Sequence, residues 1–298
     1  MKVLIIGAGG FGKYHSLSLS QHDNELIVVD PSLEARSTVN KLLNRKSKSY
    51  SNLAAVDSAI PFDFCIIATS ANIRVEQLLA VKRKFLVRKY LLEKVIINSI
   101  GDSEKLQTLD MKNIYVNYAR RCYPFYQYLK NALNHIEALD IYIEGGDNAL
   151  LCNAMHYIDL YEYITSSNIT SVNTCLYGFK NAKRKGYVDA KGVIRAKSRI
   201  GSVVINNDGD STKNVITIMS EENVLLQYLE RDGILLDNIG LQWTTNIVVD
   251  QSALTQTQLA KNLEECAQLA EALPTNKMFI EALLEEEYFK KLSRVPIT

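Results

Sequence analysis

The chain has 298 residues, a mass of 33.6 kDa and a formal net charge of +1, with 34 Lys and Arg against 33 Asp and Glu. At roughly 150 residues per domain, this length predicts two domains, each able to bury its own core. Apolar content of 47% and charged content of 22% argue against a disordered chain or a coiled coil. The near-zero charge removes the global basic field of a typical nucleic-acid-binding protein.

The cysteines and the apolar segments indicate the cellular compartment in which the protein is expected. Five widely spaced cysteines without a CxxC pair argue against both a disulfide framework and a zinc site. The apolar run at the start is too short for a signal-peptide core, and no segment approaches the roughly 20 apolar residues of a spanning helix. We therefore expect a soluble, cytoplasmic protein with no metal, no membrane association and no nucleic-acid partner.

The first thirty residues follow the order strand, glycine turn, helix, strand, acid. Met1 to Ile6 is an apolar strand pattern, and Lys13 to Gln21 has helical spacing of apolar groups. A second apolar strand, Glu25 to Val29, ends at Asp30. The turn between the first strand and the helix has the sequence Gly7-Ala8-Gly9-Gly10-Phe11-Gly12.

This order is typical of a dinucleotide-binding site. Gly7 permits the tight turn, Gly9 lets the backbone approach the pyrophosphate, and Gly12 allows close helix–strand packing. Gly10 and Phe11 belong to the same turn, where the helix N-terminus offers N–H groups and a positive dipole end. Asp30 would accept hydrogen bonds from ribose hydroxyls and repel a 2′-phosphate, which favours NAD over NADP. A related Rossmann-type fold for another adenosine cofactor, such as S-adenosylmethionine, is the alternative.

Strands and helices continue to alternate up to Asn117. This alternation predicts a doubly wound parallel sheet, in which ligands bind beyond the carboxyl ends of the strands. Predicted helices cover 33–43, 73–83 and 103–109, and predicted strands cover 62–68, 85–92 and 114–117. The residues that follow strands, and are therefore candidates for the cofactor cleft, are Asp30, Thr69, Ser70, Glu93 and Lys94. Lys94 could lie beside the nicotinamide, although a solvated lysine at a strand exit is an equally ordinary explanation.

Four segments together resemble the Gfo/Idh/MocA family of NAD(P)-dependent sugar and cyclitol oxidoreductases. They are the glycine turn with His15 behind it, Ile66-Ile67-Ala68-Thr69-Ser70, Glu93-Lys94, and Met155-His156-Tyr157-Ile158-Asp159-Leu160. The resemblance covers residues 1–165 and implies that Lys94 and His156 are catalytic. The sequence departs from the family at four positions, where Val95 and Ser70 stand for prolines, Arg74 for a histidine and Cys152 for an aspartate.

The second domain is expected to begin near residue 119, which divides the chain into 1–118 and 119–298. Arg120 and Arg121 follow the last strand and could bind a substrate carboxylate or phosphate, or simply bridge domains at the surface. Segment 123–135 is predicted as a helix and 136–144 as a strand. The helix predicted over 149–165 presents Cys152, His156, Asp159 and Tyr163 on one face. Cys152, His156 and Asp159 are the candidate substrate-binding residues there, with Asp159 favoured as structural.

The remaining sequence predicts a largely antiparallel open sheet followed by two helices. The predicted strands cover 171–177, 192–199, 202–206, 214–219, 223–230, 234–237 and 243–249. The two helices cover 252–273 and 274–292, separated at Pro274. The fold class is thus α/β, with a Rossmann domain and a C-terminal α+β domain. In the resembling family such a sheet often forms a subunit contact, which implies a homo-oligomer.

Residues 180–199 contain eight basic side chains and one acid, Asp189. We expect a solvated hairpin there, with binding of an anionic partner or a phosphorylated substrate as the alternative.

The function predicted from these features is hydride transfer between a nicotinamide and a secondary alcohol or ketone of a sugar-like substrate. A nucleotide sugar and an acidic sugar are the candidate substrates. His156 has the natural pKa for proton transfer at neutral pH, and Lys94 would stabilise the charge that develops on the same oxygen. Cys152 lacks the charge that orients such a pair, so a catalytically silent NAD-binding regulator is the competing hypothesis. An NADPH-dependent imine or biliverdin-type reductase is a third, which Asp30 disfavours.

Overall fold

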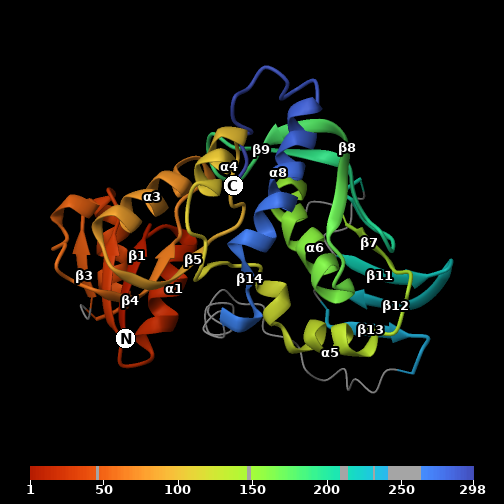
Figure 1. The fold of residues 1–298 in the computed structure, drawn as a ribbon, viewed down its shortest axis with the longest axis horizontal. Helices are drawn as coiled ribbons and strands as arrows, with labels where there is room; N and C mark the ends of the chain where they lie inside the picture. Colours follow the sequence, from red (N-terminus) through yellow and green to blue (C-terminus); the bar gives the residue numbers. More distant parts are fainter. Residues whose placement is uncertain (45–46, 146–148, 209–213, 231, 241–262) are drawn as a thin grey trace. The chain divides into compact units, whose positions relative to one another are not determined.

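The computed structural model describes residues 1–44, 47–145, 149–208, 214–230, 232–240 and 263–298 (Figure 1). The chain forms two compact units. The first contains Met1–Ile97, Gly101–Cys122 and the described part of Gln251–Leu273. The second contains Asn98–Ile100, the described part of Tyr123–Asp250, and Pro274–Thr298.

The first unit is built on a seven-stranded sheet with the strand order β14-β6-β5-β4-β1-β2-β3. All its strands are parallel except β14, which pairs antiparallel with β6. The strands are β1 (Lys2–Ile6), β2 (Glu25–Val29), β3 (Ser47–Tyr50), β4 (Phe62–Ile67), β5 (Val87–Leu92), β6 (Ile114–Val116) and β14 (Ala267–Gln268). The central strands are buried because their residues are apolar at consecutive positions, as a sheet covered on both faces requires.

Helices connect these strands. They are α1 (Gly10–Ser20), α2 (Leu33–Leu42), α3 (Ala71–Lys84) and α4 (Ile100–Gln107), together with two short 3₁₀ helices, η1 (Leu53–Ala55) and η2 (Ala119–Cys122). The order from β3 through β1 and β4 to β6 is that of dinucleotide-binding domains, with the reversal between β1 and β4. The loops after β1 and β4 therefore diverge, and the expected ligand crevice lies at their carboxyl ends.

The second unit contains a seven-stranded sheet with the order β13-β12-β11-β7-β10-β9-β8. Only β7 and β10 pair in parallel, and the other neighbours are antiparallel. The strands are β7 (Asp140–Glu144), β8 (Ile169–Asn181), β9 (Val188–Ser198), β10 (Ser202–Asn206), β11 (Val215–Ser220), β12 (Asn223–Leu229) and β13 (Ile234–Asp237).

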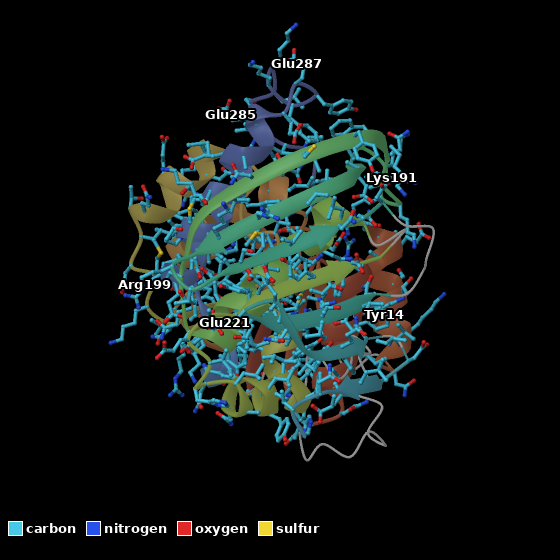
Figure 2. All side chains as sticks on the ribbon, turned by 90° about the vertical axis from the view of Figure 1, so that its right-hand side faces the viewer. Tyr14, Lys191, Arg199, Glu221, Glu285 and Glu287 are labelled. Atoms are coloured by element: carbon cyan, nitrogen blue, oxygen red, sulfur yellow. The ribbon has the colours of Figure 1, made fainter. Side chains whose placement is uncertain are left out.

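One face of this second sheet is covered by helices. Helix α6 (Leu150–Thr165) packs on β9 and β10, and α5 (Pro124–Ala132) packs on α6. Figure 2 shows the opposite face, where no helix of the described residues lies in front of the strands; the labelled Lys191 belongs to β9 and Arg199 directly follows it. The predicted fold class, a Rossmann domain plus an α+β domain with a largely antiparallel open sheet, is confirmed.

Two features of the first unit differ from the predicted elements. The short strand β3 was not predicted, because Ser47–Tyr50 is polar and lies at the sheet edge, paired only with β2. Helices α1 and α3 begin two or three residues earlier than expected, since the helical turns start inside the Gly and Ser-Ala segments that precede the apolar pattern.

The helix boundaries predicted near the C-terminal end are wrong. The predicted break at Pro274 does not occur, since the single helix α8 (Leu269–Glu285) passes through this residue. Its apolar side chains on both sides of Pro274, including Leu273 and Phe279, are buried, and this packing outweighs the proline's missing hydrogen bond. Residues 263–268, also predicted as helix, form the 3₁₀ turn η3 (Leu263–Glu265) and β14. The predicted strand 243–249 and the segment 252–262 lie outside the described residues.

The compact units also divide the chain differently from a single cut at residue 118. The first unit continues to Cys122, and residues 267–268 add strand β14 to its sheet. A helix long and apolar enough to cross a membrane is absent from the described ranges.

Candidate functional site

The glycine turn after β1 is shaped by close backbone contacts. Gly7 has a φ of 100°, a conformation that side chains rarely adopt, and its N–H donates to Val29 O at 2.8 Å. A Cβ on Gly12 would stand 1.8 Å from Gly7 O. Gly12 therefore allows α1 to lie directly against the end of β1, as the sequence predicted for helix–strand packing.

Gly9 and Gly10 are different, because no described atom lies within 4 Å of a Cβ built on either of them. Packing within the chain therefore does not explain these two glycines. They stand at the start of α1, where the first amides of a helix have no partner inside the helix. Phe11, in the same turn, is 43% exposed. Open space above helix amides is what a pyrophosphate needs in order to approach the backbone, so this turn fits a dinucleotide.

Asp30 lies at the carboxyl end of β2, beside the glycine turn. Its Oδ2 accepts from Ala8 N–H at 2.7 Å, and its Oδ1 accepts from Ser32 N–H at 2.7 Å. Two backbone amides thus hold the carboxylate in one orientation. That this carboxylate binds ribose hydroxyls and repels a 2′-phosphate stays a prediction from the sequence.

The loop after β4 brings Thr69 and Ser70 to the same edge of the sheet. The Thr69 hydroxyl is buried and has no hydrogen-bond partner among the residues that the structure describes. Ser70 precedes α3 and donates its hydroxyl to Asn72 Oδ1 at 2.6 Å. A buried hydroxyl without a partner is uncommon, and at this edge it is suited to bind a polar group of a ligand.

Glu93, at the end of β5, is buried and takes part in a hydrogen-bond network. Its Oε1 lies 2.7 Å from His15 Nε2, on α1, and accepts from Asn117 Nδ2 at 2.8 Å, after β6. Burial alone would raise the pKa of Glu93, but the hydrogen bonds from His15 and Asn117 and the nearby charge of Arg74 hold it below its ordinary value. This network ties three elements together at the carboxyl edge of the sheet.

Lys94 follows Glu93 directly and is buried to 8% exposure. The next peptide bond, Lys94–Val95, is cis. The guanidinium of Arg74, in the first turn of α3, donates to both Val95 O and Thr69 O. Arg74 is itself buried, so one planar side chain joins the loop after β4 to the loop after β5, in which Lys94 lies.

Arg120 and Arg121 lie in the 3₁₀ helix η2, which belongs to the first unit. Both are half-buried, and Arg121 N–H donates to Tyr118 O at 3.1 Å. The structure therefore keeps the pair in one turn after β6, as the sequence indicated.

In the second unit, α6 presents the predicted face. Cys152 and His156 are half-buried, whereas Asp159 and Tyr163 are buried. The thiol of Cys152 donates to Thr298 O at 2.7 Å. The gradient in burial separates the beginning of the helix, which a small molecule can reach, from a part that belongs to the core.

Three contributors were missed by sequence reasoning. Arg74 was noted only as a departure from the family, Asn117 only as the end of a strand, and Asp189 only as the single acid in a basic stretch. Ala149, at the N-cap position of α6, makes no side-chain hydrogen bond to the helix. Asp189 caps the helix instead, since its Oδ1 accepts from Leu151 N–H at 3.1 Å. Each acts through a partner far away in the sequence, and no local spacing signals such a contact.

The strand order of the first unit is that of Rossmann-type folds, and a separate, largely antiparallel sheet forms the second unit. Solved structures of proteins with this fold resemble the chain over nearly its whole length. UDP-N-acetylglucosamine 3-dehydrogenase from Acidithiobacillus ferrooxidans is 14% identical, with a TM-score of 0.70 over 98% of this chain and 99% of that one. Myo-inositol dehydrogenase from Lactobacillus casei, solved with NAD(H) and myo-inositol, is 16% identical, with a TM-score of 0.64 over 99% and 95%.

A third similar structure is the WlbA dehydrogenase from Bordetella pertussis with NADH and UDP-GlcNAcA, which is 16% identical, with a TM-score of 0.66 over 100% of this chain and 98% of that one. No family model and no curated protein matches the sequence. These neighbours are Gfo/Idh/MocA oxidoreductases, so the resemblance inferred from the motifs is confirmed at the level of the fold.

Proposed function

We propose that the chain is an NAD-dependent oxidoreductase that interconverts a secondary alcohol and a ketone on a sugar-like substrate. The glycine turn carries the proposal, because Gly9 and Gly10 leave open space above the start of α1 and Asp30 holds a fixed carboxylate beside it. The dehydrogenases of the same fold that were solved with NAD(H) or NADH, and with inositol or UDP-GlcNAcA, support the nicotinamide cofactor and the sugar-like substrate class.

In this proposal the cofactor residues are those that follow the strands of the first sheet. The turn Gly7 to Gly12 binds the pyrophosphate, and Asp30 accepts from the adenine ribose. Thr69 and Ser70 contact the cofactor after β4, while Glu93 supports this edge through its hydrogen bonds with His15 and Asn117. When bound, the nicotinamide accepts or supplies the hydride. The Asp30 charge makes NAD the preferred form over NADP.

The proposed catalytic residues are Lys94 and His156. Alcohol oxidation requires a base for the hydroxyl proton, and an imidazole titrates in the right range. The Lys94 ammonium stabilises negative charge on the substrate oxygen. Arg120, Arg121 and Cys152 are the proposed residues around the substrate, and Asp159, the fourth candidate, is buried and is proposed to have a structural role. Lys94 and His156 belong to different units, so a double-mutant cycle on turnover tests whether they act on one substrate.

The decisive test measures NADH binding by fluorescence titration and then NADH formation from NAD with a panel of sugars, uronates and nucleotide sugars. We expect saturable NADH binding that is tighter than NADPH binding, and substrate-dependent NADH formation with at least one member of the panel. Failure to bind NADH would overturn the proposal.

A catalytically silent NAD-binding protein is the second candidate. Cys152 favours it, since this position has a thiol bonded to Thr298 O in place of an aspartate. Tight NADH binding without turnover across the whole panel is the result expected from this alternative.

We also propose that the helix-free face of the second sheet forms a contact between copies of the chain. Tyr177 on β8 and Leu236 on β13 are apolar and 45% and 55% exposed. Light scattering of the purified protein tests this, and a monomeric mass at micromolar concentration would contradict it.

A further inference from the structure

A cavity of about 340 Å³ lies within the second unit, at the beginning of α6. Its walls come from the start of α6, the end of β8, the turn that joins β8 to β9, and the start of β9. Cys152 contributes from α6, and three cationic side chains contribute from β8 and the turn, Lys180, Lys183 and Arg184. Three of the eight basic residues of the stretch at 180–199 thus line this cavity, whereas the other five, Lys185 among them, do not.

Among the residues lining this cavity, Asp189 is the one acidic side chain, and it is buried. Its Oδ1 accepts from Leu151 N–H at 3.1 Å, so part of its charge is directed to the helix amide. Three cationic side chains and one acidic side chain give the lining side chains a summed charge of +2. The start of α6 adds the positive end of the helix dipole. The cavity is thus electropositive, and the hydrogen bond from Leu151 N–H already offsets part of the negative charge of Asp189.

Arg184 is held at the cavity by two contacts. Its guanidinium donates to Thr298 Oγ1 at 3.4 Å and lies over the ring of Tyr187, 5.9 Å from its centroid. A guanidinium held in this way loses less entropy when it binds an oxyanion, and its planar fork matches a carboxylate or a phosphate. Lys183 is exposed on the same turn, next to Arg184.

The cavity also lies close to the proposed base. Cys152 lines it, and His156 follows four residues later on the same face of α6, which is about 6 Å along the helix axis. A group bound among the cations is therefore separated from His156 by roughly one helical turn, a distance comparable to the width of a sugar ring.

We propose that this cavity binds an oxyanion substituent, a carboxylate or a phosphate, of the sugar-like substrate. The inference rests on the proposed function and narrows its substrate class to acidic or phosphorylated sugars. A volume of about 340 Å³ is at the low end for small-molecule sites, so the cavity accommodates the anionic group and adjoining atoms rather than a whole nucleotide sugar.

The experiment compares the affinities of three probes that share one ring: glucose, glucose 1-phosphate and glucuronate. Calorimetric titrations use the full chain with NADH bound, in wild type, in Lys183→Ala/Arg184→Ala and in Lys185→Ala. Lys185 is the matched control, because it is an exposed cation of the same turn that does not line the cavity. We expect at least one anionic probe to bind about tenfold more tightly than glucose, and the double variant to lose most of that difference.

Added salt should reduce the same preference in wild type, because the cations are exposed and therefore screened. The preference should persist in Lys185→Ala within about twofold. A preference for the phosphate alone or for the carboxylate alone supports the inference and identifies the group. Equal affinity for all three probes, no binding of either anion at millimolar concentration, or an equal loss in Lys185→Ala overturns it. Because NADH binding is measured first, loss of that binding identifies failure of the proposed function, whereas normal NADH binding without an anion preference rejects this inference alone.

Discussion

The carboxyl edge of the first sheet and the beginning of α6 are built in different ways. At the first, backbone groups dominate: glycines without side chains, amides that hold Asp30, and carbonyls held by Arg74. At the second, long side chains from the end of β8 and the turn that joins β8 to β9 line a cavity, together with Cys152, which stands where the resembling family has an aspartate. The difference teaches that the proposed cofactor site depends mainly on backbone geometry, whereas the proposed substrate cavity depends on side chains.

The largest expected effect concerns Lys94. Lys94→Ala should lower kcat about 10²–10³-fold, because it removes the proposed charge opposite the reacting oxygen. The affinity for NADH should change little, and this result would show that Lys94 acts in the chemical step rather than in cofactor binding. Lys89→Ala, an exposed lysine on the same strand β5, is the control and should retain full turnover. Unchanged turnover in Lys94→Ala would remove the lysine from the mechanism.

The next effect distinguishes two kinds of glycine in one turn. Gly12→Ala should lower the free energy of unfolding by about 3 kcal/mol, because its Cβ would stand 1.8 Å from Gly7 O and must displace backbone. Gly9→Ala should leave stability within about 0.5 kcal/mol while weakening NADH binding about tenfold or more, since only a ligand would meet the added methyl. Urea unfolding and NADH titration measure both.

Gly101→Ala provides the control for these glycines. Gly101 lies in α4, and a Cβ there would meet no atom within 4 Å. We expect a gain of about 0.5–1 kcal/mol from better helix propensity and no change in NADH affinity. Equal destabilisation by Gly9→Ala and Gly12→Ala would contradict the distinction between packing and ligand glycines.

A smaller effect concerns Glu93 and pH. The pKa of Glu93 is lowered in the folded state from 4.5, so its ionised form stabilises the fold above about pH 4.5. That stabilisation is lost as the pH falls through the lowered pKa. Glu93→Gln should cost about 2 kcal/mol at neutral pH and flatten the loss of stability in acid. Glu104→Gln, at an exposed position of α4, should leave the pH profile unchanged, and an identical profile in Glu93→Gln would reject the role of the network.

The smallest effect concerns the beginning of α6. Cys152→Asp introduces a carboxylate into the wall of the cationic cavity and should weaken anionic sugars about threefold relative to glucose. Cys152→Ser, which keeps a small neutral side chain, should leave the ratio unchanged. Tighter binding of anionic sugars to Cys152→Asp would show that the cavity does not select them by charge.

Local patterns in the sequence determined most of the first unit. Apolar runs predict β1, β2 and β4, because a strand buried on both faces needs apolar residues at consecutive positions. The glycine turn and Asp30 are predictable for a similar reason, since the conformation at Gly7 and the contact at Gly12 exclude side chains. In the second unit, the bounds of strands β10 and β13 match the prediction.

Only the tertiary structure decided the remainder. The polar edge strand β3 forms because β2 offers a ladder, and α8 passes through Pro274 because its flanking apolar residues are buried. Asn117 on Glu93, Arg74 between two loops and Asp189 at the start of α6 pair residues that are 21 to 38 positions apart or join separate elements. Three cations of the basic stretch line one cavity because β8 pairs with β9 beside α6. The local sequence determines which backbone conformations are possible, whereas contacts between side chains distant in the sequence form only once the chain has folded.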